Sequence, residues 1–155
     1  MRPLLILLLP AVLLSACAPR APEGVDSAVL DEAVANAIGS PSTCVLVAEN
    51  GGGKIVYRYG THTVCARSIN ACDAPGTTTA TAQLEAARKG VTRTASCDTA
   101  EEASRGVAWA SAPLPVLEGK PDRKMAYSAF MESDNALSGR EAKLRLERAF
   151  EKAGL

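Results

Sequence analysis

Cys17 is the residue whose neighbouring sequence gives the clearest indication of a chemical role. It ends the sequence LSAC, which follows an apolar run from Leu4 to Leu14, and that run follows Arg2. A membrane-spanning helix needs about 20 apolar residues, so the run is too short to cross a bilayer. It is typical of an export signal that is removed from the mature protein. A cysteine at the cleavage point provides a thiol that can be acylated.

The LSAC ending at residues 14–17 resembles the lipobox of bacterial lipoproteins. In that family the cysteine thiol receives diacylglycerol, and the new amino terminus is usually acylated too. The resemblance implies that residues 1–16 are a lipoprotein signal peptide and that Cys17 is the lipidated first residue of the mature chain. Two or more acyl chains hold a protein on its membrane. The alternatives are an ordinary signal in which Cys17 is incidental, and an apolar tail that stays attached.

Residue 18 bears on the choice of membrane. In the lipoprotein family an aspartate after the acylated cysteine is the usual signal for retention in the inner membrane, whereas this chain has Ala18. The resemblance therefore implies a cell-envelope protein, lipid-anchored on the periplasmic face of the outer membrane.

Four further cysteines offer a second kind of chemistry: Cys44, Cys65, Cys72 and Cys97. An even number in an exported protein predicts two disulfides, because the envelope is oxidising. Three pairings are open. The short sequence CARSINAC favours a bond between Cys65 and Cys72, which leaves Cys44 and Cys97 to join the first strand to a later element. There is no CxxC and only one histidine, so we expect no metal site.

A ligand surface near the cysteine loop is the remaining chemical hypothesis, with His62, Arg67 and Ser68 as its candidate residues. Such a site requires that these three side chains line one concavity. A Ser-His-Asp triad would need His62 as its base, but the chain has no GxSxG elbow and nothing selects one serine. The sequence GGGK at residues 51–54 leads into a strand pattern, which predicts a turn and not a phosphate-binding loop.

Composition limits the classes of partner. The chain has 17 basic and 17 acidic residues, so no basic field predicts nucleic-acid binding. Aromatic residues make up 4% of the chain, which is too few to build sugar-binding walls or base-stacking platforms. We therefore expect no nucleic-acid partner and no cofactor.

Periodicity and turn residues predict how these groups are positioned. Residues 17–25, with three positions occupied by Pro or Gly, have the composition of a tether from the lipid to a single domain at 26–155. The elements predicted within that domain are a helix at 27–38, a hairpin of strands 43–49 and 55–59, an irregular excursion at 60–78, a short helix at 79–89, a strand at 91–97, a turn or helical turn at 98–105, strands at 106–112 and 124–133, and a final helix.

Two of these elements carry further detail. Both faces of the strand 124–133 are apolar, which predicts a central strand covered on each side. The final helix begins with a capping box, in which the Ser138 hydroxyl accepts from the Glu141 N–H and the Glu141 carboxylate reaches back to Ser138. Gly154 ends this helix, and Leu144 lies on its polar face.

Together the elements predict an α+β fold, in which an antiparallel sheet of about five strands has the amino- and carboxy-terminal helices packed on one face.

This order of elements resembles the sheet half of serine β-lactamases and penicillin-binding transpeptidases. The last two strands and the final helix that carry the resemblance are RGVAWASAPLP and KMAYSAFMESDNALSGREAKLRLERAF. That family has its nucleophile in SxxK and a KTG on its third strand. Here no serine has a lysine three residues later, and the third strand reads VTRTASC.

The sequence therefore favours a membrane-anchored envelope lipoprotein that is a non-catalytic binding or structural module. Its expected partners are the membrane, through Cys17, and an envelope protein or cell-wall component. The alternative is a degenerate or divergent β-lactamase-like, penicillin-recognising hydrolase.

Overall fold

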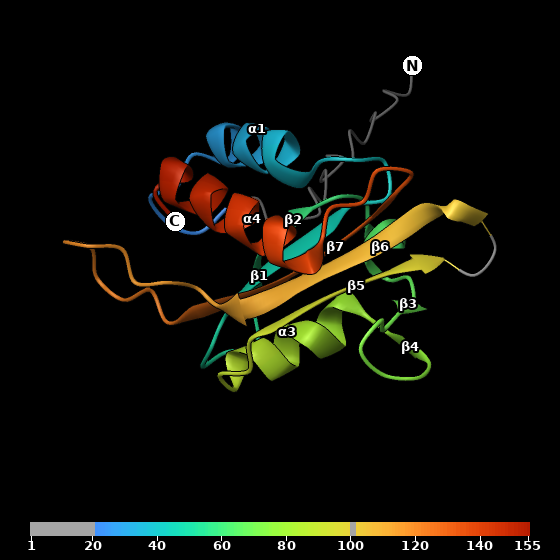
Figure 1. The fold of residues 1–155 in the computed structure, drawn as a ribbon. Coiled ribbons are helices and arrows are strands. Elements are labelled where there is room, and N and C mark those ends of the chain that lie inside the picture. Colours follow the sequence, from blue (N-terminus) through green and yellow to red (C-terminus); the bar gives the residue numbers. More distant parts are fainter. Residues whose placement is uncertain (1–20, 100–101) are drawn as a thin grey trace, which may run out of the picture.

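A five-stranded antiparallel sheet organises the chain, as predicted. The computed structural model describes residues 21–99 and 102–155, with the backbone alone at 102–104. The strands of the main sheet are β1 (Cys44–Glu49), β2 (Ile55–Tyr59), β5 (Arg93–Thr99), β6 (Glu102–Pro113) and β7 (Met125–Ser133). They lie in the order β2-β1-β7-β6-β5, and every neighbouring pair is antiparallel (Figure 1).

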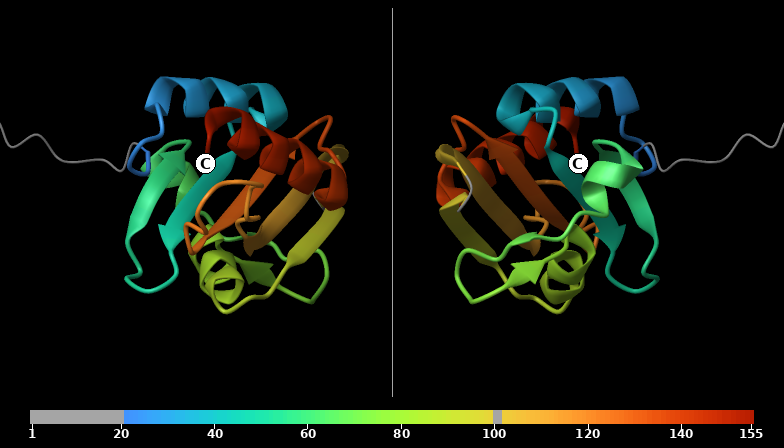
Figure 2. Two further views of the ribbon diagram at one scale, coloured as in Figure 1. Left: turned by 90° about the vertical axis from the view of Figure 1, so that its left-hand side faces the viewer. Right: turned by 90° about the vertical axis from the view of Figure 1, so that its right-hand side faces the viewer.

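Helices cover both faces of this sheet (Figures 1 and 2). The terminal helices α1 (Ser27–Ile38) and α4 (Gly139–Ala153) pack side by side on one face, which confirms that prediction. The opposite face carries α3 (Ala80–Arg88), together with a small ribbon of β3 (Ile69–Asn70) and β4 (Thr77–Thr78). The central strand β7 is buried along its first seven residues, as its two apolar faces predict.

The helix α1 is positioned by its cap and its apolar stripe. Asp26 caps it by accepting from the backbone N–H of Ala28 at 2.8 Å. Leu30, Val34 and Ile38, spaced four residues apart, are buried against the sheet.

The helix α4 has the predicted boundaries and part of the predicted cap. The Ser138 hydroxyl accepts from the Glu141 N–H at 3.2 Å, and Gly154 ends the helix with φ of 78°. The carboxylate of Glu141 departs from the capping box, because it accepts from Arg145 Nε at 2.7 Å instead of returning to Ser138. Leu144 is 44% exposed, as its place on the polar face predicts.

The face under α3 has its own core. Trp109 of β6 and Phe130 of β7 lie with ring centroids 5.1 Å apart, and Leu84 of α3 packs in the same cluster. The buried hydroxyl of Ser128 donates to the Ala80 carbonyl oxygen at 2.6 Å, which fixes the start of α3 on β7. Burial of large side chains on both faces is the main source of stability in such a sheet.

The segment 98–105 differs from its prediction as a turn or helical turn. β5 continues to Thr99 and β6 begins at Glu102, so the two strands form a long hairpin that pairs Thr99 with Glu102. The sequence of this segment, DTAEEASR, has no run of apolar residues, and its first two residues end β5, which is the edge strand of the described sheet. Polarity therefore gave no sign of the strand.

Residues 21–25, within the predicted tether 17–25, pack against the domain. Pro22 is buried, and Ala21 and Val25 contact the core beneath α1 and α4. Arg123 Nη1 donates to the Glu23 carbonyl oxygen at 3.0 Å. The signal peptide 1–16, Cys17 and residues 18–20 lie outside the described residues.

Candidate functional site

The candidate residues His62, Arg67 and Ser68 lie on the excursion that joins β2 to α3. This excursion begins with α2 (His62–Cys65), whose cap is Thr61, and the Thr61 hydroxyl accepts from the Val64 N–H at 3.1 Å. The three candidate side chains belong to exposed residues.

Two of these side chains hold the excursion in place. Arg67 Nη2 lies 2.7 Å from Glu132 Oε2 at the end of β7, where the Glu132 side chain is 14% exposed. The Ser68 hydroxyl donates to the Thr77 hydroxyl at 2.7 Å, across the β3–β4 ribbon. None of the three candidates lines any of the hollows described below. The structure therefore places them near one another along the chain but not around a described concavity.

All four of the cysteines beyond Cys17 form disulfides, but the favoured pairing is wrong. Cys44 is bonded to Cys65 with Cα atoms 5.1 Å apart, and Cys72 is bonded to Cys97 with Cα atoms 5.2 Å apart. Each bond links the excursion to a different strand of the main sheet, β1 in one case and β5 in the other.

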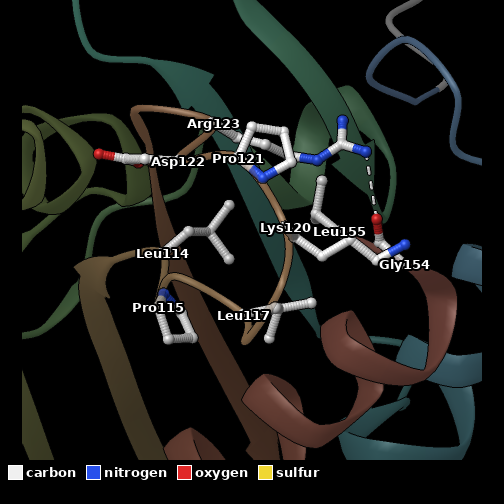
Figure 3. Close-up of a pocket in the computed structure, with 9 residues that line it drawn as sticks. All are labelled: Leu114, Pro115, Leu117, Lys120, Pro121, Asp122, Arg123, Gly154 and Leu155. Carbon is white, nitrogen blue, oxygen red and sulfur yellow. Dashed lines mark hydrogen bonds between the residues drawn. The ribbon is translucent and has the colours of Figure 1, made fainter.

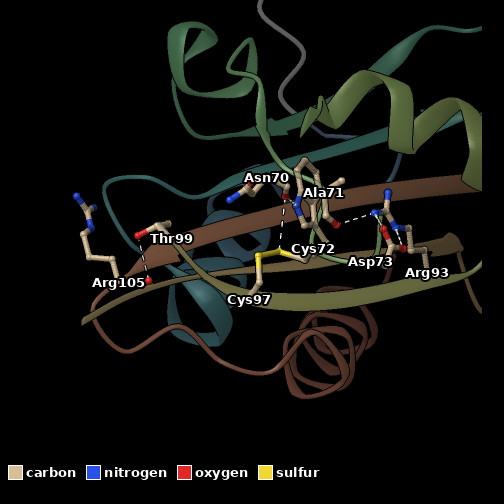
Figure 4. Close-up of a disulfide and its surroundings, with 9 residues drawn as sticks. Asn70, Ala71, Cys72, Asp73, Arg93, Cys97, Thr99 and Arg105 are labelled. Atoms are coloured by element: carbon tan, nitrogen blue, oxygen red, sulfur yellow. Dashed lines mark hydrogen bonds and ion pairs between the residues drawn. A yellow bond between two sulfur atoms is a disulfide. The ribbon is translucent and has the colours of Figure 1, made fainter. Parts of the chain in front are cut away.

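The path of the excursion explains this pairing. Between Cys65 and Cys72 the chain crosses the sheet face from β1, past β7 and β6, to β5, a width of three strand spacings or about 14 Å. Midway across, Trp109 Nε1 of β6 donates to the Asn70 carbonyl oxygen at 2.7 Å. Arg93 of β5 completes the attachment, because its guanidinium pairs with Asp73 and donates to the Ala71 carbonyl oxygen at 2.6 Å (Figure 4).

One hollow lies beside the carboxyl terminus, between the loop that joins β6 to β7 and the end of α4 (Figure 3). Leu114, Leu117 and Leu155 give it apolar walls, and Arg123 closes it by donating to the Gly154 carbonyl oxygen at 3.2 Å. Its volume is about 20 Å³, which is room for roughly one water molecule. Binding of a larger molecule here would require the loop to move.

A second hollow, of about 400 Å³, lies at the edge of the sheet where β5 meets the start of α4. Ser96 and Asp98 of β5 and Ser138 of the α4 cap line it. Gly139 brings the helix close to the strands here, since a Cβ atom at this position would lie 2.5 Å from the Ala95 carbonyl oxygen. The hollow is open to solvent and is shaped by this close approach.

A third hollow is a groove of about 250 Å³ between α1 and α4, which we call the α1–α4 groove. Small residues form its sides, with Ala33 and Ala37 on α1 and Ala149 on α4. The polar residues that line it are Asn36, Arg145, Arg148 and Lys152. Within the described part of the chain no carboxylate lines this groove, so the charged groups seen along it are all cations.

The described residues contain no group of three or more His, Cys, Asp and Glu side chains that could hold a metal ion. Within the same part of the chain, no helix is both long enough and apolar enough to cross a membrane. The chain matches no protein-family model, no curated protein and no solved structure.

Two buried tyrosines have perturbed acidity without forming a site. Burial raises the pKa of Tyr57 above its ordinary value of 10.0, and its hydrogen bond to Asp31 raises it further. Burial also raises the pKa of Tyr127, and the charge of Glu147 adds to that effect. Lys143 Nζ lies 2.8 Å from both Glu147 carboxylate oxygens, so this second pair is part of a structural network on the sheet-facing side of α4.

The sequence analysis did not predict the α1–α4 groove. Its cations follow the spacing i, i+3 and i+7 on one helix, which the sequence already shows. Its alanines come from two helices that are far apart in the chain, so the groove exists only once α1 and α4 pack together.

Proposed function

We propose that this protein is a lipid-anchored component of the bacterial envelope whose disulfide-bonded domain is a non-catalytic binding module. The observation that carries the proposal is the combination of LSAC at residues 14–17 with a domain in which Cys44, Cys65, Cys72 and Cys97 are all paired. Disulfides persist in oxidising compartments, which is where a lipobox sends a protein.

The role of the module as a binder is supported by how its polar side chains are used. Arg67 has a partner on β7 and Arg93 of β5 has partners on the excursion, so both hold the excursion to the main sheet, whereas Ser68 bonds to Thr77 within the excursion itself. These groups stabilise a rigid surface held at the membrane. An envelope protein or a cell-wall component is the partner that such a location offers.

Acylation at Cys17 is tested by growth of the native host with an alkyne analogue of palmitate. We expect label on the wild-type chain and none on Cys17→Ala, with the variant retained as the longer precursor. A labelled Cys17→Ala variant would contradict the proposal. Ala18→Asp is the matched variant for location, because it should keep the label but shift the protein from the outer to the inner membrane.

A second candidate function is a divergent penicillin-recognising hydrolase. It is supported by the element order, in which a helix and a hairpin precede the excursion, and three strands and a closing helix follow it. A labelled penicillin separates the two proposals. A covalent adduct on a serine of the intact protein would favour the hydrolase, and the absence of an adduct is the result that the binding-module proposal predicts.

A further inference from the structure

The α1–α4 groove has the charge of a site for an anion. Three cations, Arg145, Arg148 and Lys152, lie along its α4 side. Arg145 is shared with Glu141, since its Nε donates to the Glu141 carboxylate at 2.7 Å. Among the described residues, Arg148 and Lys152 form no ion pair, and both are exposed. The two helices also carry acidic residues, none of which lines the groove as the described residues form it: Asp31, Glu32, Glu141, Glu147 and Glu151.

The position of the amino terminus points to the source of that anion. The chain meets the domain at the carboxyl end of α4, where Arg123 donates both to the Glu23 carbonyl oxygen at 3.0 Å and to the Gly154 carbonyl oxygen at 3.2 Å. Lys152, at one end of the groove, is two residues before Gly154. The groove therefore begins close to the point at which the anchored segment joins the fold.

The length of that segment sets the distance from the membrane. Ala21 already packs on the core beneath α1 and α4, and only four residue steps separate it from Cys17. Four fully extended residues span at most about 14 Å. If Cys17 is acylated, this end of the α1–α4 layer is therefore held at the level of the lipid headgroups.

We propose that the α1–α4 groove docks on the membrane that holds the anchor, with Arg145, Arg148 and Lys152 contacting the phosphates of anionic lipid headgroups. This inference rests on the proposed lipid anchor at Cys17. Basic residues near an anionic leaflet strengthen the membrane binding of an acylated protein. Each basic residue adds its own electrostatic contribution to the binding free energy, beyond that of the acyl chains. The docking fixes which surface of the domain faces the membrane. It leaves α3 and the disulfide-bonded excursion at residues 60–78 on the side that faces away from the membrane.

The test uses the acylated mature protein reconstituted in two kinds of vesicle, one of phosphatidylcholine alone and one that also contains phosphatidylglycerol. The readout is acetylation of lysine side chains, measured residue by residue by mass spectrometry. We expect Lys152 to be labelled several times more slowly on the anionic vesicles than on the neutral ones, with the difference abolished by high salt. Lys54 and Lys89, exposed at the β1–β2 turn and beyond α3, serve as internal controls that should not change.

The variant R145Q/R148Q should restore labelling of Lys152 on anionic vesicles, since loss of each cation weakens the contact by about fivefold. Lys89→Gln, on the opposite side of the molecule, should leave the protection of Lys152 intact. Equal labelling of Lys152 on the two kinds of vesicle would overturn the inference, and so would protection that appears only when an acidic envelope protein is added. Failure of the wild-type protein to remain on neutral vesicles would instead contradict the lipid anchor itself.

Discussion

Tyr57 on the edge strand β2 donates a hydrogen bond to Asp31 on α1, with 2.9 Å between the two oxygen atoms. Tyr57 is fully buried, so this bond ties the first helix to the outermost strand on its side of the sheet. In an equivalent contact, the Tyr127 hydroxyl of β7 donates to the Glu147 carboxylate of α4 at 3.0 Å. The two phenols therefore pin the two terminal helices to the sheet.

These contacts predict that the free energy of unfolding falls at alkaline pH. The folded state raises the pKa of both phenols above the ordinary value of 10.0, so the unfolded chain loses its protons first as the pH rises. Stability from this source is complete below pH 10.0 and falls above it, by about 1.4 kcal/mol per pH unit for each tyrosine. Urea unfolding measured across this range should show the loss, and Y57F/Y127F should reduce the slope. An unchanged slope in the double variant would contradict the assignment.

The disulfide pairing gives a second prediction. Digestion of the unreduced protein should release one peptide pair that contains Cys44 and Cys65 and another that contains Cys72 and Cys97. The bonds close loops with sequence separations of 21 and 25 residues, so C44S/C65S and C72S/C97S should each lower the free energy of unfolding by about 3 kcal/mol. A peptide that links Cys65 to Cys72 would refute the structure of the excursion.

The sequence could predict those parts of the fold that depend on local patterns. The two β-rich runs on either side of the turn at residues 50–54 define the first hairpin, and Ser138 with Gly154 defines the ends of α4. The terminal helices each have one apolar stripe, which requires a shared layer on the sheet. Their common face was therefore predictable.

The disulfides and the groove depend on tertiary path, which local patterns do not contain. The eight-residue sequence from Cys65 to Cys72 suggested a closed loop, but burial of Ile69 and the hydrogen bond from Trp109 to Asn70 draw this segment straight across the sheet. The cations of the α1–α4 groove were visible in the sequence, but only the antiparallel packing of α1 against α4 places them beside Ala33 and Ala37.

Gly60 predicts a large effect from a single methyl group. Its φ is +90°, and a Cβ atom there would lie 2.3 Å from the Thr43 carbonyl oxygen. Gly90 is the matched control, because its φ is +91° and no atom of the described residues lies within 4 Å of a Cβ built there. Gly90→Ala should cost about 1 to 2 kcal/mol for the backbone conformation alone. Gly60→Ala should cost clearly more in thermal unfolding, and equal costs would contradict the close approach.

Substitution of Ser128 measures how much one buried hydrogen bond contributes to the free energy of unfolding. Its hydroxyl donates to the Ala80 carbonyl oxygen at 2.6 Å, so Ser128→Ala removes a buried hydrogen bond between β7 and α3 and should cost about 0.5 to 1.5 kcal/mol. Ser111 pairs with Ser128 in the sheet register and is also buried, but its hydroxyl makes no hydrogen bond within the described part of the chain. Ser111→Ala should therefore be close to neutral in chemical denaturation. A similar loss in both variants would refute the contact with α3.

The intact mass of the protein from native-host envelopes tests the central proposal most directly. The account predicts a chain that begins at Cys17, carries diacylglycerol and amino-terminal acyl groups, and retains two disulfides. An unmodified amino terminus, or a cytosolic chain with four reduced thiols, would contradict it.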